Sequence, residues 1–204
     1  MNQEKKQEMI EKIEVLMQEN HGVVKAEKLY PLGLTYRQIQ GLVQKGILDH
    51  VKNGYYSMHL QQRSEDELIL AMFPDGILTM DTALFYHGYC GERPEEWSIA
   101  ISKNVSKSRF KVEQPVICPY YTEPEVLQMG VEKIPFAQGE IGIYSKERLI
   151  CDCLKYEERL DRVIMKTALM AYINEPDKDI AALMEYARVR KVTAKVQSRI
   201  GVWL

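Results

Sequence analysis

The sequence predicts an α+β fold, in which a small N-terminal helical domain with a β-hairpin precedes a larger domain of helices around a small sheet. Two observations support this division. Apolar residues recur at helical spacing near the N-terminus, whereas from Trp97 to Ile101 they alternate with small residues, which is the period of a half-buried strand. A polar stretch at residues 60–65 separates the two regions. We therefore expect one domain over residues 1–60 and a second over residues 64–204.

Charge is distributed unevenly along the 204 residues, although the net charge is only −2. Residues 1–60 carry 8 Lys/Arg and 7 Asp/Glu, residues 61–186 carry 14 and 22, and residues 187–204 carry 5 and none. This distribution indicates separate roles for the parts of the chain. The N-terminus is charged and no apolar run approaches the roughly 20 residues of a membrane span, so we expect a cytoplasmic protein without a signal peptide or a membrane partner.

The N-terminal segment predicts a helix, a short strand and a second helix. Met9, Ile13 and Met17 recur at helical spacing between charged residues, which favours an amphipathic helix over residues 3–19. Residues 23–24 predict a short strand. Residues 25–30 predict a short helix that stops at Pro31, because proline lacks the N–H that continues a helix.

A third helix is predicted between Thr35 and Gly46. The Thr35 hydroxyl can cap the first turn, Ile39 and Leu42 belong to an apolar stripe at helical spacing, and Gly46 supplies a stop. The helix otherwise carries long hydrogen-bonding side chains of the kind that contact base edges and phosphates. The candidate DNA-binding residues of this segment are Thr35, Tyr36, Arg37, Gln38, Gln40, Gln44 and Lys45.

A β-hairpin is predicted directly after this helix. Asn53-Gly54 between the β-forming residues Val51 and Tyr55 is a strong hairpin signal, because Asn and Gly both tolerate positive φ. The third helix then takes the position of a recognition helix, and the hairpin that of a wing. We predict a winged helix-turn-helix that binds duplex DNA, with Lys52 and Asn53 on the wing contacting phosphate. The alternative is a purely structural helix and hairpin.

The second domain is predicted to open with a capped helix and to continue into a sheet flanked by helices. Ser64, followed three residues later by Glu67, forms a capping-box pattern. Another helix ends at Gly88, where His87 is expected to make a hydrogen bond or a dipole contact at the C-terminal end of the helix. Four strands are then expected, at residues 97–101, 116–118, 131–134 and 141–144. Three more helices are expected: one that starts at residue 145, one over residues 163–172 and one over residues 180–187.

The C-terminal tail is predicted to be a helix with a basic stripe. If residues 188–203 are helical, four cations lie within about 80° of one another and four apolar residues line the adjacent face. The cations are Arg188, Lys191, Lys195 and Arg199, and the apolar residues are Val192, Val196, Ile200 and Trp203. We expect the stripe either to contact an anionic partner or to be a solvated face. A helix break at Thr193 would disrupt this arrangement.

The sequence contains none of the common catalytic or nucleotide-binding motifs. It has no phosphate-binding glycine loop, no H-E-x-x-H, no G-x-S-x-G and no paired cysteine motif, so we expect no enzymatic activity, metal or cofactor. The four cysteines are expected to be reduced. Asp152 is expected to be a buried acid paired with an arginine such as Arg148, and the basic loop at residues 103–111 to be solvated or to contact an anion. An enzyme built on Asp152, Arg148 and His87 is the least favoured alternative.

Three stretches of the chain resemble, in their order and residues, motifs of a known protein family. They are the predicted winged helix, the helix from Thr82 that ends in His87-Gly88, and the strand followed by Glu147-Arg148 and Asp152, with residues 183–187 as a weaker fourth match. In this order they resemble the AbiEi-like antitoxins of abortive-infection toxin–antitoxin systems.

The resemblance implies an N-terminal domain that binds operator DNA and represses its own operon. It also implies a C-terminal domain that counters a nucleotidyltransferase-like toxin. The small positive surplus of residues 1–60 departs from the strongly basic character of many DNA-binding domains. The alternative is a winged-helix transcriptional regulator whose C-terminal domain binds a small molecule or another protein.

Overall fold

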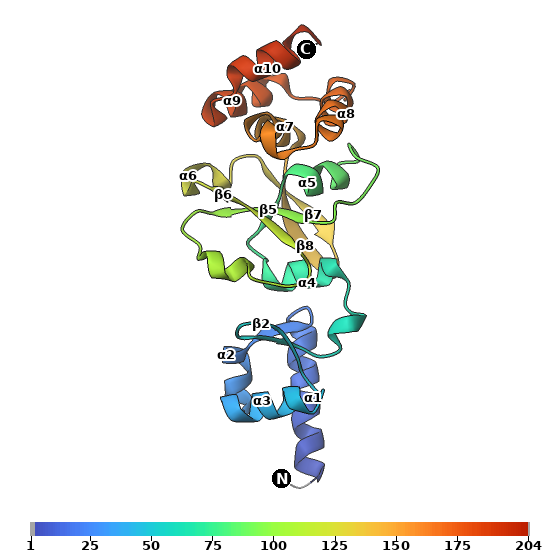
Figure 1. The fold of residues 1–204 in the computed structure, drawn as a ribbon, viewed down its shortest axis with the longest axis vertical. Coiled ribbons are helices and arrows are strands. Elements are labelled where there is room, and N and C mark those ends of the chain that lie inside the picture. The colour runs from blue at the N-terminus through green and yellow to red at the C-terminus, as the bar shows by residue number, and fades with distance from the viewer. Residues whose placement is uncertain (1–2, 204) are drawn as a thin grey trace. The chain divides into compact units, whose positions relative to one another are not determined.

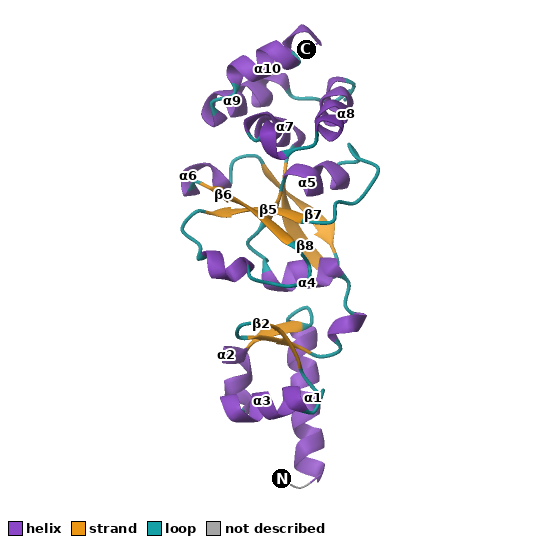
Figure 2. Ribbon diagram, viewed as in Figure 1, coloured by secondary structure: helices purple, strands orange, loops and turns teal. Residues whose placement is uncertain are grey.

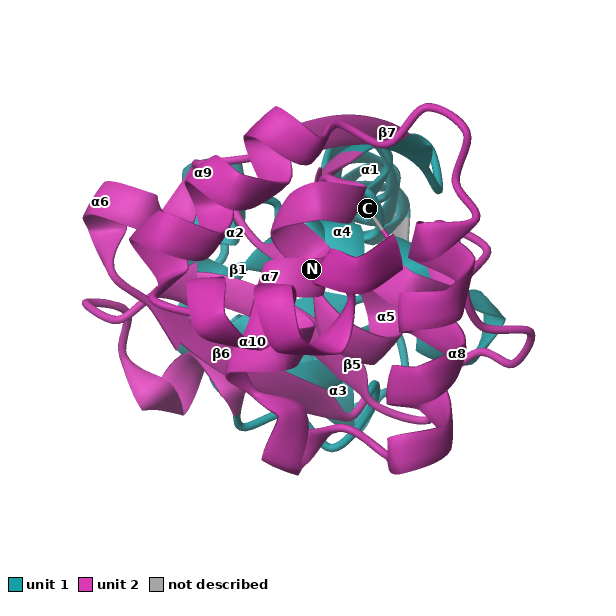
Figure 3. Cartoon of the chain, turned by 90° about the horizontal axis from the view of Figure 1, so that it is seen from above, with its two compact units in different colours: residues 1–74, 111–115, 135–140 teal, residues 75–110, 116–134, 141–204 magenta. Residues whose placement is uncertain are grey.

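The computed structural model describes residues 3–203, which form ten α-helices and two β-sheets (Figure 2). The predicted α+β class is therefore confirmed. The chain divides into two compact units (Figure 3). Of the described residues, unit 1 contains those up to 74 together with 111–115 and 135–140, and unit 2 contains 75–110, 116–134 and those from 141 onward.

Unit 1 contains the helices and the hairpin that the sequence predicts near the N-terminus (Figure 1). Its strands form an antiparallel sheet in the order β1-β3-β2. The second helix ends one residue earlier than predicted and continues as a short 3-10 turn that contains Pro31, since proline is tolerated in the first turn of a helix. The elements are α1 (Gln3–Glu19), β1 (Val23–Lys25), α2 (Ala26–Leu29), η1 (Tyr30–Leu32), α3 (Tyr36–Gln44), β2 (Asp49–Lys52), β3 (Tyr55–Ser57), η2 (Leu60–Gln62) and α4 (Glu65–Met72).

The core of unit 1 fixes which side of α3 faces outward. Ile13 and Met17 from α1, Ile39 from α3 and Tyr56 from β3 are each at most 2% exposed and belong to one apolar cluster. Burying a large apolar side chain contributes about 1.5–3 kcal/mol. The predicted apolar stripe, including Leu42, thus holds α3 against the core and leaves its other face to solvent.

Unit 1 extends beyond the predicted boundary at residue 60. Ser64 and Glu67 form the predicted capping box at the start of α4, each side chain bonding the other residue's backbone N–H. Phe73, which follows α4, is fully buried, and the Lys52 ammonium lies 4.7 Å from the centroid of its ring. The Lys52–Phe73 contact and the packing of α4 against β1 link this segment to the N-terminal elements, and unit 1 accordingly runs to Pro74.

The second sheet has five strands in the order β6-β5-β4-β8-β7. Strand β4 pairs antiparallel with β5 and parallel with β8, while β5 pairs parallel with β6. Four of the strands are predicted, but the central strand β4 is not, because two residues are too few to show an alternating pattern. The strands are β4 (Ile77–Leu78), β5 (Trp97–Ser102), β6 (Ile117–Thr122), β7 (Val131–Phe136) and β8 (Gly139–Tyr144).

The helices of unit 2 include all those predicted except for one continuous C-terminal helix. The short helix α6, which begins at a proline, is not predicted. The elements are α5 (Met80–Tyr86), η3 (Lys107–Phe110), α6 (Pro124–Leu127), α7 (Lys146–Lys155), η4 (Glu157–Arg159), α8 (Arg162–Ile173), α9 (Ile180–Arg190), α10 (Thr193–Arg199) and η5 (Gly201–Trp203).

A buried ion cluster joins α7 to α9. The Arg148 Nε donates to Asp152 Oδ2 at 3.2 Å, as the sequence predicts, and the Arg190 Nε donates to Asp152 Oδ1 at 2.5 Å. All three residues are at most 3% exposed. The cluster and the hydrogen bond between His87 Nε2 and the Tyr144 carbonyl (2.7 Å) give structural roles to Asp152, Arg148 and His87.

Candidate functional site

Helix α3 begins with a complete capping box. The Thr35 hydroxyl accepts a hydrogen bond from the Gln38 N–H at 3.3 Å, and the Gln38 side-chain oxygen accepts one from the Thr35 N–H at 2.8 Å. This reciprocal cap fixes the start of the helix, and therefore the direction of each side chain on its first turn. The Gln38 oxygen is used in the cap, so its amide N–H₂ is the part of this side chain that can donate to a ligand.

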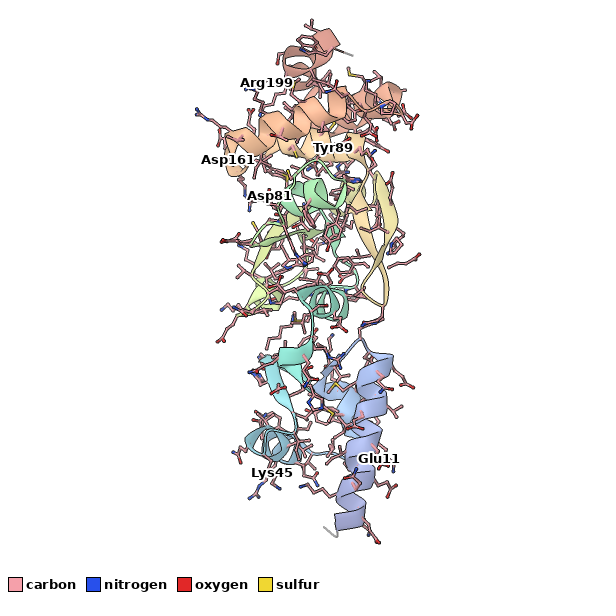
Figure 4. The ribbon with its side chains drawn as sticks, turned by 90° about the vertical axis from the view of Figure 1, so that its right-hand side faces the viewer. Glu11, Lys45, Asp81, Tyr89, Asp161 and Arg199 are labelled. Carbon is pink, nitrogen blue, oxygen red and sulfur yellow. The ribbon has the colours of Figure 1, made fainter. Side chains whose placement is uncertain are left out.

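The outer face of α3 retains most of the predicted DNA-binding side chains. Tyr36 is 62% exposed, and Arg37, Gln44 and Lys45 are exposed as well. Lys45, labelled in Figure 4, lies at the C-terminal end of the helix. The face therefore offers a guanidinium, an ammonium, an amide and a phenol to a ligand.

Gln40 has a different role from its predicted neighbours. Its side chain is half-buried, and its Nε2 donates to the Tyr56 hydroxyl at 2.9 Å. Burial of Tyr56 raises the pKa of this hydroxyl. Gln40 therefore links α3 to strand β3 and helps to hold the helix against the hairpin.

Lys52 does not lie where the sequence predicts. It is 6% exposed, and its ammonium lies 4.3 Å from the Tyr55 ring centroid and 4.7 Å from that of Phe73. The register of β2 against β3 shifts between His50 and Lys52, and such a bulge redirects the side chains that follow it. The predicted phosphate contact of Lys52 is therefore wrong. Asn53 remains exposed at the turn.

Lys25 provides an exposed cation beside this turn, at a position that the sequence does not predict. It pairs with Tyr55 in the sheet register, and its ammonium lies 5.6 Å from the Tyr55 ring centroid. The next residue, Ala26, donates its N–H to the Gly54 carbonyl at 2.8 Å, which ties β1 to the hairpin turn. The local sequence gives no sign of this position, because it arises from strand pairing.

Lys6 is a second missed cation. Together with Gln38 and Lys45 it lines a hollow of about 150 Å³ between α1 and α3. Apolar side chains, Met9 and Leu42 among them, also line this hollow. The Lys5-Lys6 pair is visible in the sequence, but only the packing of α1 brings Lys6 to α3.

The near-neutral charge of residues 1–60 conceals an uneven distribution. Five of the seven acidic residues lie on α1, where Glu11 is labelled in Figure 4, and α3 carries none. The charged side chains of α3 and its C-cap are the cations Arg37 and Lys45. The surface that α3 presents is therefore more basic than residues 1–60 as a whole.

The predicted C-terminal helix is interrupted. Helix α9 ends at Arg190, Lys191 adopts a left-handed conformation with φ 60°, and α10 starts at Thr193. The N–H groups of Lys191 and Val192 bond the carbonyls at the end of α9, which closes the helix as a Schellman motif. The single helix over residues 188–203 is therefore wrong.

The four predicted cations of the tail do not form one unneutralised stripe. Glu157 on η4 accepts from Lys195 at 2.7 Å and from Arg199 at 3.3 Å. Arg188 and Lys191 remain exposed. This neutralisation could not be predicted from the sequence, because Glu157 lies far away along the chain. Of the predicted apolar face, Val192, Val196 and Ile200 are buried, whereas Trp203 is 68% exposed.

The basic loop of unit 2 is partly neutralised within the unit. Lys103 forms an ion pair with Glu123, and Arg109 forms one with Asp75. Lys107 is exposed, and so is Lys111, the last residue of the loop, which belongs to unit 1.

Within residues 3–203, no group of three or more His, Cys, Asp or Glu side chains is arranged to hold a metal ion, and the four cysteines are free. Over the same described stretch, no helix has both the length and the apolar character needed to cross a membrane. The sequence matches no protein-family model, and comparison with curated proteins gives no match either.

Proposed function

We propose that the chain is a sequence-specific DNA-binding repressor, in which unit 1 acts as a winged helix-turn-helix with α3 as its recognition helix. The observation that carries the proposal is α3 itself. This capped helix is fixed by the buried Ile39, exposes Tyr36, Arg37 and Gln44, and is followed at once by a hairpin. Arginine and glutamine are the side chains that pair bidentately with guanine and adenine edges in the major groove.

The side chains divide into two kinds of DNA contact. Arg37, in the first turn of α3, takes the position from which recognition helices contact bases. Lys45, Lys25 and Asn53, which lie at the end of α3 and around the turn, contact phosphates and set the orientation. Lys25 thereby takes the role that the sequence assigns to Lys52.

The proposal is tested with Arg37→Ala in the full chain and a duplex that covers the region upstream of its gene. Loss of a base contact costs about 1–3 kcal/mol, which is roughly 5- to 150-fold in affinity, and relaxes sequence preference. Lys12→Ala is the matched control, because it removes one cation from α1 that already pairs with Glu8 at 2.7 Å. An Arg37→Ala variant that binds with wild-type affinity and selectivity contradicts the proposal.

We also propose that unit 2 provides an antitoxin function against a nucleotidyltransferase-like toxin. The support is the resemblance carried by His87-Gly88 and by Arg148 with Asp152. In the folded unit these side chains bond to each other or to backbone, so a toxin would be recognised by other, exposed residues of unit 2.

The antitoxin proposal is tested by expressing the neighbouring gene with and without this chain. Growth arrest by the neighbour that this chain relieves supports it. A harmless neighbour, or arrest that persists, favours instead a transcriptional regulator without a toxin.

A further inference from the structure

Unit 2 contains a half-open cavity of about 690 Å³, which lies within the usual size range of small-molecule sites. Its walls come from the end of α7, from η4, from α8, from the end of α10 and from η5. The apolar lining consists of Leu154, Met165, Leu169, Met170, Ile173 and Trp203. Because several elements enclose it, this is a concave site and not a flat helix face.

Helix α8 presents more apolar surface than its packing uses. Among its twelve residues, only Ala168 and Tyr172 are buried, while Met170 is 51% exposed. Trp203, across the cavity, is 68% exposed. Methionine and tryptophan side chains adapt to, and bury, the apolar parts of ligands.

Two cations, Arg162 and Lys166, are among the residues that line this cavity. Arg162 and Lys166 lie one turn apart at the start of α8, after its N-cap Asp161, which is labelled in Figure 4. Neither has an ion-pair partner within the residues that the structure describes. Glu157, the half-buried carboxylate of the lining, is already bound by Lys195 and Arg199, which leaves the exposed Glu158 as the opposing charge.

We propose that this cavity binds a small amphipathic carboxylate, with its apolar body against Met165, Leu169 and Trp203 and its carboxylate between Arg162 and Lys166. The two cations supply charge-assisted hydrogen bonds to the anionic group, and the methionines shape the floor to the apolar body. The inference goes beyond the proposed function and does not depend on DNA binding.

The test is calorimetric titration of the full chain with decanoate, and with 1-decanol as its neutral counterpart. Decanoate is expected to bind saturably with one site per chain. Arg162→Gln with Lys166→Gln should weaken decanoate binding at least tenfold and bring it to the level of decanol. The matched control is Arg188→Gln with Lys191→Gln, which removes two exposed cations of unit 2 outside the cavity and should leave binding unchanged.

Several results would overturn the proposal. They are the absence of decanoate binding, equal binding of decanoate and decanol by the wild type, unchanged binding in the cavity variant, and equal weakening by the control variant. Analytical sedimentation tests whether a second copy of the chain fills the cavity instead. Dimers that dissociate with Met170→Glu would show that a copy fills the cavity, and would replace the small ligand.

Discussion

Replacing Asp152 by asparagine tests whether the buried ion cluster holds α7 to α9. The variant keeps the shape of the side chain but leaves Arg148 and Arg190 as two buried guanidinium groups without a counter-charge. Removing one partner of a buried pair costs about 3–5 kcal/mol. Since a whole protein is stabilised by about 5–15 kcal/mol, this loss is a large fraction of the total.

The assay is urea unfolding followed by tryptophan fluorescence, because Trp97 and Trp203 both belong to unit 2. With a slope of about 2 kcal/mol per molar urea, a loss of about 4 kcal/mol lowers the midpoint by about 2 M. Glu157→Gln is the control, since it breaks two partly exposed ion pairs that are worth about 0.2–1 kcal/mol each.

If Asp152→Asn changes the unfolding free energy of unit 2 by less than about 1 kcal/mol, which is the upper limit for an exposed pair, the buried ion cluster does not hold α7 to α9. A double variant separates charge from packing. If the unpaired charges cause the loss, adding Arg190→Met to Asp152→Asn should recover part of the stability. If packing is the cause, the second substitution adds a further loss.

Three further substitutions in unit 2 are tested in the same urea assay. Two of them are expected to raise the unfolding free energy and one to lower it. Lys191→Gly should stabilise by about 1 kcal/mol, because glycine adopts the left-handed conformation without steric cost, and an unchanged midpoint would contradict this. Asp81→Asn should stabilise at pH 7 but not at pH 3. Burial raises the pKa of the Asp81 carboxyl, so the folded state of the wild type loses stability as the pH rises through that pKa. If Asp81→Asn stabilises equally at pH 7 and pH 3, burial of the charged carboxylate is not the reason. Gly130→Ala should destabilise by more than about 1 kcal/mol, since φ is 70° and the added Cβ would lie 2.8 Å from the Arg148 Cβ; a neutral effect would refute the close approach.

The local elements of unit 1 were largely predictable because their signals are short-range. Thr35 and Gln38 form the cap, Ile39 continues the core stripe, and Asn53-Gly54 forms the turn. Each of these features depends on residues within one or two turns of each other, which is the range over which sequence patterns act.

The parts that were not predicted depend on pairing between distant residues or on one irregular position. A single bulge in β2 buries Lys52, and strand pairing brings Lys25 to the turn in its place. Glu157 neutralises Lys195 from 38 residues away along the chain. The helix break at Lys191 could not be predicted, because the left-handed residue that ends α9 is a lysine and not a glycine.

The central claim is that the chain binds DNA sequence-specifically through α3. It is tested most directly by measuring the affinity of the full chain for labelled duplexes by fluorescence anisotropy. One duplex carries the region upstream of the gene, and the other carries the same bases in shuffled order. We expect the upstream duplex to bind at least about 10³-fold more tightly at physiological salt, with an affinity that falls as the salt concentration rises. Equal binding of the two duplexes, or binding of neither, would contradict it.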